Sequence, residues 1–164
     1  MRIARSLAVL ATGTAAVFAL LPAAGAQAAH SIGGYAVQCV NIPQRPSGES
    51  GIQVAVDGLG SDHPRNALMA ARARVSANSA CGATTAATVV RIQIDKVALI
   101  RYGKGVVTSA GPRVGGRTIT LDTPGRAGAC AQYYVGVRFS VRFAAGDLGH
   151  GNINGPLFAG TGTC

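Results

Sequence analysis

Residues 130–143 have the sequence CAQYYVGVRFSVRF, and this stretch decides the fold class. Hydrophobic side chains occupy every second position from Val135 to Phe143. The positions between them hold Gly136, Arg138, Ser140 and Arg142. A period of two is typical of a β-strand that packs one face on a core and exposes the other to water. The stretch therefore predicts an antiparallel strand with a cationic outer face.

Residues 89–102 predict a second long strand with one irregularity. Hydrophobic residues alternate with polar ones as far as Ile94, but from Val97 onward they occupy the opposite phase. A period of two that slips by one residue indicates a β-bulge or a tight turn. We expect that irregularity near Asp95 and Lys96.

Glycine and proline interrupt the rest of the chain at short intervals, as in all-β proteins. Further strands are predicted over residues 32–42, 52–56, 66–78, 106–109 and 118–122. Residues 66–78 also fit a helix, but Ala71, Ala73 and Val75 alternate with arginines and favour a strand. Loops are predicted over residues 43–51, 58–64, 111–116, 123–129 and 144–156, and Gly103-Lys104-Gly105 predicts a hairpin. The expected fold is a single-domain antiparallel β-sandwich of Greek-key or immunoglobulin-like type.

The first residues have the pattern of a secretory signal peptide. Two arginines precede an uncharged apolar run over residues 6–21, which is short for a membrane span of about 20 residues. Small residues then offer cleavage after Ala26 or Ala28, and we favour Ala28. The leader would be residues 1–28 and the β-sandwich domain residues 29–164. The alanine-rich leader and the excess of arginine over lysine resemble small exported proteins of high-GC Gram-positive bacteria, so we expect a secreted, extracellular protein.

Four cysteines lie in the part expected to be exported: Cys39, Cys81, Cys130 and Cys164. An oxidising environment favours two disulfides, whereas a zinc site needs closely spaced cysteine or histidine pairs, which are absent. Four cysteines allow three pairings. We favour the two between sequence neighbours, Cys39–Cys81 and Cys130–Cys164.

Positive charge is the best lead to function. The chain has 15 Lys and Arg against 6 Asp and Glu, and 13 of the cations are arginines. Five of them lie on predicted strands: Arg72, Arg74, Arg91, Arg138 and Arg142. Guanidinium groups bind carboxylates and phosphates bidentately, and a positive net charge attracts polyanions. If these strands are neighbours, their arginines form a cationic face for an anionic partner (a wall polymer, an anionic lipid or a nucleic acid) or for an extracellular protein. The alternative is a charged face that keeps the protein soluble.

Catalytic motifs are absent from the sequence. His63 and His150, with Asp147 near the latter, lie in predicted loops, but no G-x-S-x-G or H-E-x-x-H motif accompanies them. Glu49 is the only glutamate, so the paired carboxylates of a glycosidase have no clear candidates. A small secreted hydrolase using His63 or His150 is one alternative. We expect these histidines to be solvated loop residues, with no metal site and no cofactor.

A second alternative is a protease inhibitor. Arg126 lies in the predicted loop 123–129, four residues before Cys130, where it could present a basic substrate mimic. Ordinary turn chemistry explains the same residues. The sequence therefore favours a monomeric, non-catalytic binding protein.

Overall fold

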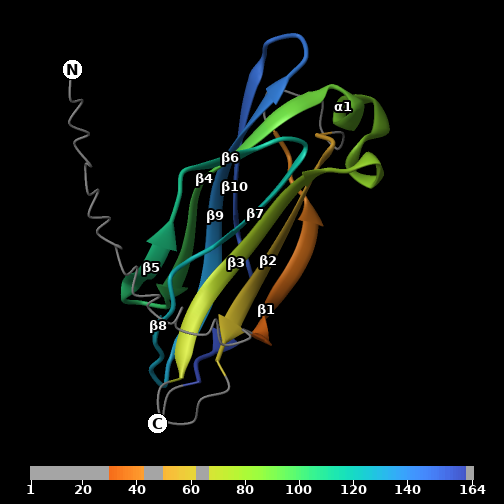
Figure 1. The fold of residues 1–164 in the computed structure, drawn as a ribbon. Helices are drawn as coiled ribbons and strands as arrows, with labels where there is room; N and C mark the ends of the chain where they lie inside the picture. Colours follow the sequence, from red (N-terminus) through yellow and green to blue (C-terminus); the bar gives the residue numbers. More distant parts are fainter. Residues whose placement is uncertain (1–29, 43–49, 62–66, 162–164) are drawn as a thin grey trace, which may run out of the picture.

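The strands of the computed structural model form two antiparallel sheets (Figure 1), and the structure describes residues 30–42, 50–61 and 67–161. The first sheet has the order β1 (His30–Cys39), β2 (Ile52–Gly60), β3 (Leu68–Ala77) and β7 (Thr118–Asp122), with β8 (Arg126–Ala127) beside β3. The second has the order β10 (Leu148–Asn154), β9 (Gln132–Phe143), β4 (Val89–Arg101) and β5 (Gly105–Ala110), with β11 (Phe158–Ala159) on β9 and β6 (Arg113–Gly115) on β4. A 3₁₀ helix, η1 (Ser79–Cys81), and a short helix, α1 (Ala83–Ala87), connect β3 to β4.

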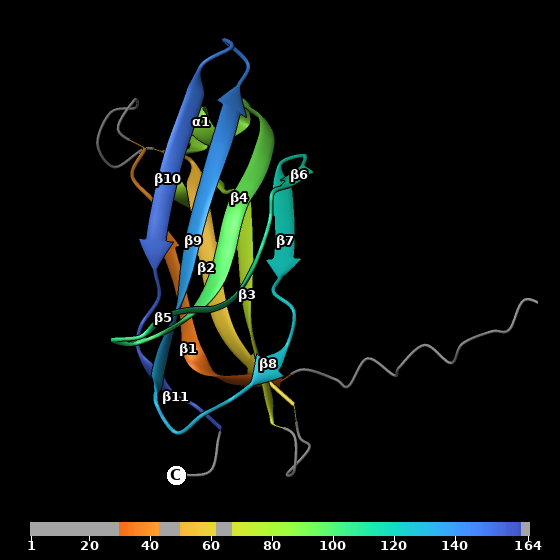
Figure 2. The same ribbon diagram turned by 90° about the vertical axis from the view of Figure 1, so that its left-hand side faces the viewer.

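The two sheets pack face to face around a hydrophobic core. Figure 2 shows β10, β9 and β4 in front of the strands of the first sheet. The core draws from both layers, including Val54, Val56, Ala73 and Val75 from the first sheet and Ile92, Ile94, Leu99 and Phe139 from the second. The predicted alternation along β9 is confirmed, because Val135 to Phe143 are buried at every second position while Arg138 and Arg142 are exposed. The prediction of two antiparallel β layers is confirmed, while the Greek-key or immunoglobulin-like assignment stays a prediction.

The predicted irregularity in β4 is a register shift between β4 and β9. Ile94 lies opposite Phe139, but the next paired residue, Lys96, lies opposite Arg138, so Asp95 is the extra residue. The shift lets both Ile94 and Val97 enter the core although they are three positions apart. It also places Asp95 and Lys96 together on the solvent side of the sheet.

One predicted disulfide is confirmed. The Cα atoms of Cys39 and Cys81 are 5.4 Å apart, and the bond joins the end of β1 to η1. The other favoured pair includes Cys164, which lies outside the described residues, so that pairing stays a prediction. The predicted leader, residues 1–28, lies outside them as well. In the segments that the structure describes, no helix has the length and apolarity needed to cross a membrane.

The predicted loop over residues 144–156 is wrong, because most of it is the strand β10 paired along β9. The glycines that suggested a loop lie beneath core side chains. A Cβ on Gly151 would come within 2.4 Å of Cζ of Phe139, and one on Gly149 within 2.7 Å of Cγ2 of Ile42. Glycine is used here because neighbouring side chains fill the space that its own would occupy.

Substitution of Gly151 by alanine is expected to destabilise the fold by about 1–3 kcal/mol, because the buried Phe139 ring would have to shift. Urea unfolding monitored by circular dichroism measures this loss. Gly116→Ala is the matched control, since a Cβ at Gly116 meets nothing within 4 Å. Equal midpoints for the two variants would contradict this packing.

Three other predicted loops contain strand residues. The strand β2 continues to Gly60, so the predicted start of the loop 58–64 is wrong. Here Gly58 lies beneath Phe158, whose Cζ would be 2.3 Å from an added Cβ. The loops predicted at 111–116 and 123–129 contain the short strands β6 and β8. The strand favoured within residues 66–78 is confirmed as β3.

Candidate anion-binding face

The five predicted arginines do not share one face. Arg72 and Arg74 lie on β3 of the first sheet. Arg91 lies on β4, and Arg138 and Arg142 lie on β9, all in the second sheet. Because the sheets face each other across the core, exposed residues of the two sheets point in opposite directions. The structure thus brings three of the five together and separates the other two.

Carboxylates compensate the charge on the first sheet. Nε and Nη2 of Arg72 each donate a hydrogen bond of 2.8 Å to a different carboxylate oxygen of Asp122. Asp57 lies directly opposite Arg72 on β2. The hydrogen bonds that Arg72 donates to Asp122, together with the charges of Asp122 and Asp57, raise the pKa of Arg72 against the opposing effect of burial. Arg72 is therefore already paired, which leaves Arg74 as the remaining arginine of the predicted five on this face.

The second sheet carries cations without such compensation. Arg91 lies directly opposite Arg142, and Lys96 lies directly opposite Arg138. All four side chains are exposed, and no described residue forms an ion pair with any of them. We call these four residues the β4–β9 cation face. Like charges directly opposite each other destabilise a sheet, and here the same pair of strands holds two such pairs.

One carboxylate, Asp95, lies among these cations, and it accepts hydrogen bonds from neutral side chains. Its Oδ1 accepts hydrogen bonds of 2.6 Å from Nε2 of Gln93 and 3.2 Å from Oγ of Ser140. The strands β4, β9 and β10 place no other carboxylate on the face. The local charge is therefore positive, with four cations against one anion.

The two cation pairs are spaced along the strands. Arg138 and Arg142 are four residues apart on β9, which corresponds to about 13 Å at a strand rise of about 3.3 Å per residue. Each pair borders its own hollow. A hollow of about 160 Å³ lies at Arg91 and Arg142, and a groove of about 250 Å³ lies at Lys96 and Arg138.

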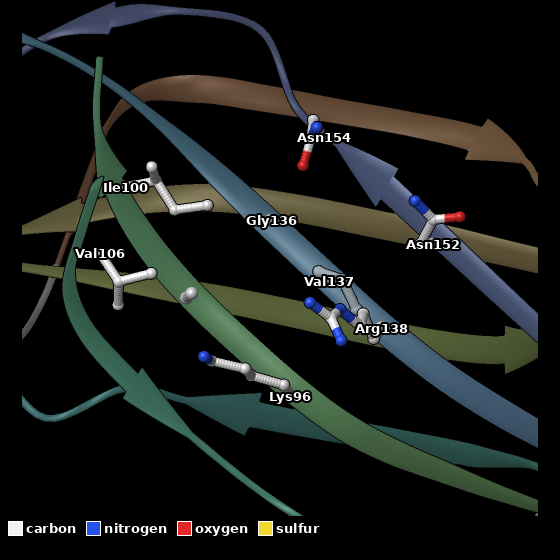
Figure 3. Close-up of a pocket in the computed structure, with 9 residues that line it drawn as sticks. Lys96, Ile100, Val106, Gly136, Val137, Arg138, Asn152 and Asn154 are labelled. Carbon is white, nitrogen blue, oxygen red and sulfur yellow. The ribbon is translucent and has the colours of Figure 1, made fainter. Parts of the chain in front are cut away.

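The groove combines charged, amide and apolar walls (Figure 3). Lys96 and Arg138 supply the cations, and Asn152 and Asn154 on β10 supply amides. Gly136 lies opposite Asn154, and an added Cβ there would come within 3.1 Å of Asn154 Oδ1. A side chain at Gly136 would therefore intrude on the groove. Ile100 and Val106 add apolar surface to the lining.

Sequence reasoning missed Lys96, Asn152 and Asn154 as site residues. Lys96 was part of the predicted bulge, but its position beside Arg138 depends on the register between β4 and β9. The two asparagines fell in a segment predicted to be a loop. The sequence signal that could have identified them is that they flank the hydrophobic Ile153, which is buried, as polar residues do on the outer face of a strand.

The residues of the hydrolase alternative do not form a catalytic arrangement in the part of the chain that is described. His63 lies outside it. His150 lies on β10 opposite Ser140, but Oγ of Ser140 donates to Asp95 instead of to the histidine. A Ser-His-Asp triad requires the serine to hydrogen-bond to the histidine. The described histidines, cysteines and carboxylates also form no group of three or more that could hold a metal ion.

Arg126, the candidate inhibitory residue, lies on a strand. It belongs to β8 and pairs with Met69 of β3. Thr123, at the start of the predicted loop, is buried, and its Oγ1 accepts a hydrogen bond from the backbone N–H of Ala71. The segment around Arg126 is therefore tied to the first sheet.

Comparison with known proteins adds no assignment. No family model, no curated protein and no solved structure matches this chain. The arrangement of charge and grooves on the second sheet is therefore the basis for a functional proposal.

Proposed function

We propose that this chain is an exported, non-catalytic binding protein whose β4–β9 cation face binds linear polyanions outside the cell. The observation that carries the proposal is the two cross-strand pairs of like charge, Arg91 opposite Arg142 and Lys96 opposite Arg138, in which no cation has an ion-pair partner among the described residues. Each such pair is expected to lower the stability of the free protein by roughly 0.2–1 kcal/mol. An anionic group between the two cations converts repulsion into two attractions.

The contrast between the two outer faces argues against solubility as the only role of the charge. On the first sheet, Arg72 is neutralised by Asp122 and faces Asp57. A charge pattern selected only for solubility would intersperse both signs in this way. The second sheet instead concentrates one sign along one pair of strands, which is the arrangement that attracts a polyanion.

The spacing of the cation pairs supports an extended ligand. The two hollows lie along the same strands, and one small anion reaches only one of them. A linear polymer that carries repeated carboxylate, sulfate or phosphate groups reaches both. Export rests on the leader pattern, and the Cys39–Cys81 disulfide is compatible with an oxidising environment.

Heparin binding at several salt concentrations tests the proposal. Release of counterions from about four contacts predicts that the logarithm of the association constant falls with the logarithm of salt concentration with a slope of about −3. The double variant Lys96→Ala/Arg138→Ala is expected to lower the affinity about 10–100-fold and to reduce the slope to about half. Isothermal titration calorimetry measures both quantities.

The matched control is Arg74→Ala/Arg126→Ala, which removes the same number of charges from strands of the first sheet. The control is expected to retain affinity within about threefold, because a face that points away from the ligand contributes only a screened, long-range attraction. Equal losses in the two double variants, or binding that does not depend on salt, would overturn the proposal.

A further inference from the structure

We infer that the groove at Gly136 binds an acidic sugar unit, so that the preferred polyanion is an acidic polysaccharide. This inference rests on the proposed function, because it uses Lys96 and Arg138 of the β4–β9 cation face. It adds a second requirement, hydroxyl groups on the ligand, which the asparagines of β10 would recognise.

The two asparagine side chains are available for a ligand. Asn152 and Asn154 are exposed on β10, opposite Arg138 and Gly136 respectively. Neither side-chain amide hydrogen-bonds to another described residue. An asparagine amide both donates and accepts hydrogen bonds, and a sugar hydroxyl does the same. A row of amides beside a row of cations therefore matches a unit that carries both hydroxyls and an acid group.

The size of the groove fits one unit of a polymer. Its volume of about 250 Å³ is below the roughly 300–1,000 Å³ of pockets that enclose a whole small molecule. Ile100 and Val106 add an apolar surface against which the C–H groups of a sugar ring can pack. The absence of a side chain at Gly136 leaves room between Ile100 and Asn154, where an added Cβ would lie only 3.0 and 3.1 Å from their atoms.

The chemistry between the cation pairs disfavours a single-stranded nucleic acid. Such ligands bind grooves in which aromatic rings stack on successive bases. The outward positions of β9 between Gly136 and Arg142 carry no aromatic side chain. Tyr102 and Tyr134 line the adjoining hollow near the turn from β4 to β5, which shares Ile100 and Asn154 with the groove but lies outside the stretch between the two cation pairs.

The experiment compares two carboxylate polymers at one salt concentration. Polygalacturonate carries one carboxylate and free hydroxyls on each unit, whereas poly-L-glutamate carries one carboxylate and no hydroxyl. The mature wild-type protein is expected to bind polygalacturonate about tenfold more tightly, since a few unpaired amides gain hydrogen bonds. Oligodeoxythymidine is the third probe, and tighter binding of it than of polygalacturonate would overturn the choice of polysaccharide.

Substitutions in the groove separate this inference from the general proposal. Asn152→Ala/Asn154→Ala is expected to lower polygalacturonate affinity about tenfold and to leave poly-L-glutamate affinity within about twofold. Gly136→Ala, which fills the same space, is expected to reduce the preference in the same direction. If Lys96→Ala/Arg138→Ala weakens both polymers while the asparagine variant retains the preference, the inference fails and the proposed function stands. If neither variant weakens either polymer, both fail.

Discussion

Substitution of Arg142 by glutamate is expected to raise the stability of the free protein and to lower its affinity for heparin about 100-fold. Arg142 lies directly opposite Arg91, so the substitution replaces a repulsive cross-strand pair by an attractive one. Opposite charges at such positions contribute roughly 0.2–1 kcal/mol, and the lost repulsion adds a similar amount, for a gain of about 1 kcal/mol. The binding face loses one cation and presents a carboxylate to the polyanion at the same position, which accounts for the larger loss of affinity.

The informative outcome is that Arg142→Glu raises the stability of the protein while it lowers the affinity for heparin. The unfolding midpoint in urea at low salt measures the first, and heparin titration at the same salt concentration measures the second. Arg74→Glu is the control, because it changes the net charge equally on β3, where Ala55 and Thr120 are the cross-strand neighbours. It is expected to give no stabilisation and a much smaller loss of affinity. Destabilisation by Arg142→Glu would contradict the repulsion on which the proposed function rests.

The two longest strands, with the bulge, were predictable because burial of one face imposes a period of two on the sequence. In β9 the period identified the core positions Val135 to Phe143, and in β4 its slip predicted an irregularity near Asp95 and Lys96, which the register places at Asp95. The same reasoning failed at β10, where Gly149 and Gly151 replace hydrophobic residues at inward positions. Phe139 of β9 and Ile42, which follows the end of β1, fill that space, and local composition does not contain this information.

The candidate site was only partly predictable for a related reason. The exposed arginines followed from strand alternation, but their distribution over two faces follows from strand order. The strands β3 and β9 belong to different sheets, so Arg72 and Arg138 point away from each other. The pairing of Arg72 with Asp122 spans 50 residues of sequence. Contacts of this kind depend on long-range register, which a pattern of single residues does not determine.

Substitution of Phe158 by alanine is expected to destabilise the protein by about 3–5 kcal/mol, the largest loss expected here for a single side chain. Phe158 lies on β11, which pairs with β9, yet its ring covers glycines of the first sheet. A Cβ on Gly34 or Gly58 would come within 2.4 and 2.3 Å, respectively, of ring atoms. The ring therefore links the end of the second sheet to β1 and β2.

A double-mutant cycle tests this link more sharply than the single variant. Gly58→Ala alone is expected to be destabilising, because its methyl group would collide with the Phe158 ring. In the Phe158→Ala background the collision with the ring is gone and only the close approach to the Gly33 carbonyl oxygen, 2.8 Å, remains, so the cost of the methyl group should fall, with a coupling energy of roughly 1–3 kcal/mol. Leu157→Ala is the neighbouring control, since Leu157 is 49% exposed and should cost less than about 1 kcal/mol. Additive losses for Gly58 and Phe158, or equal losses for Leu157 and Phe158, would show that the two sheets are held together without this ring.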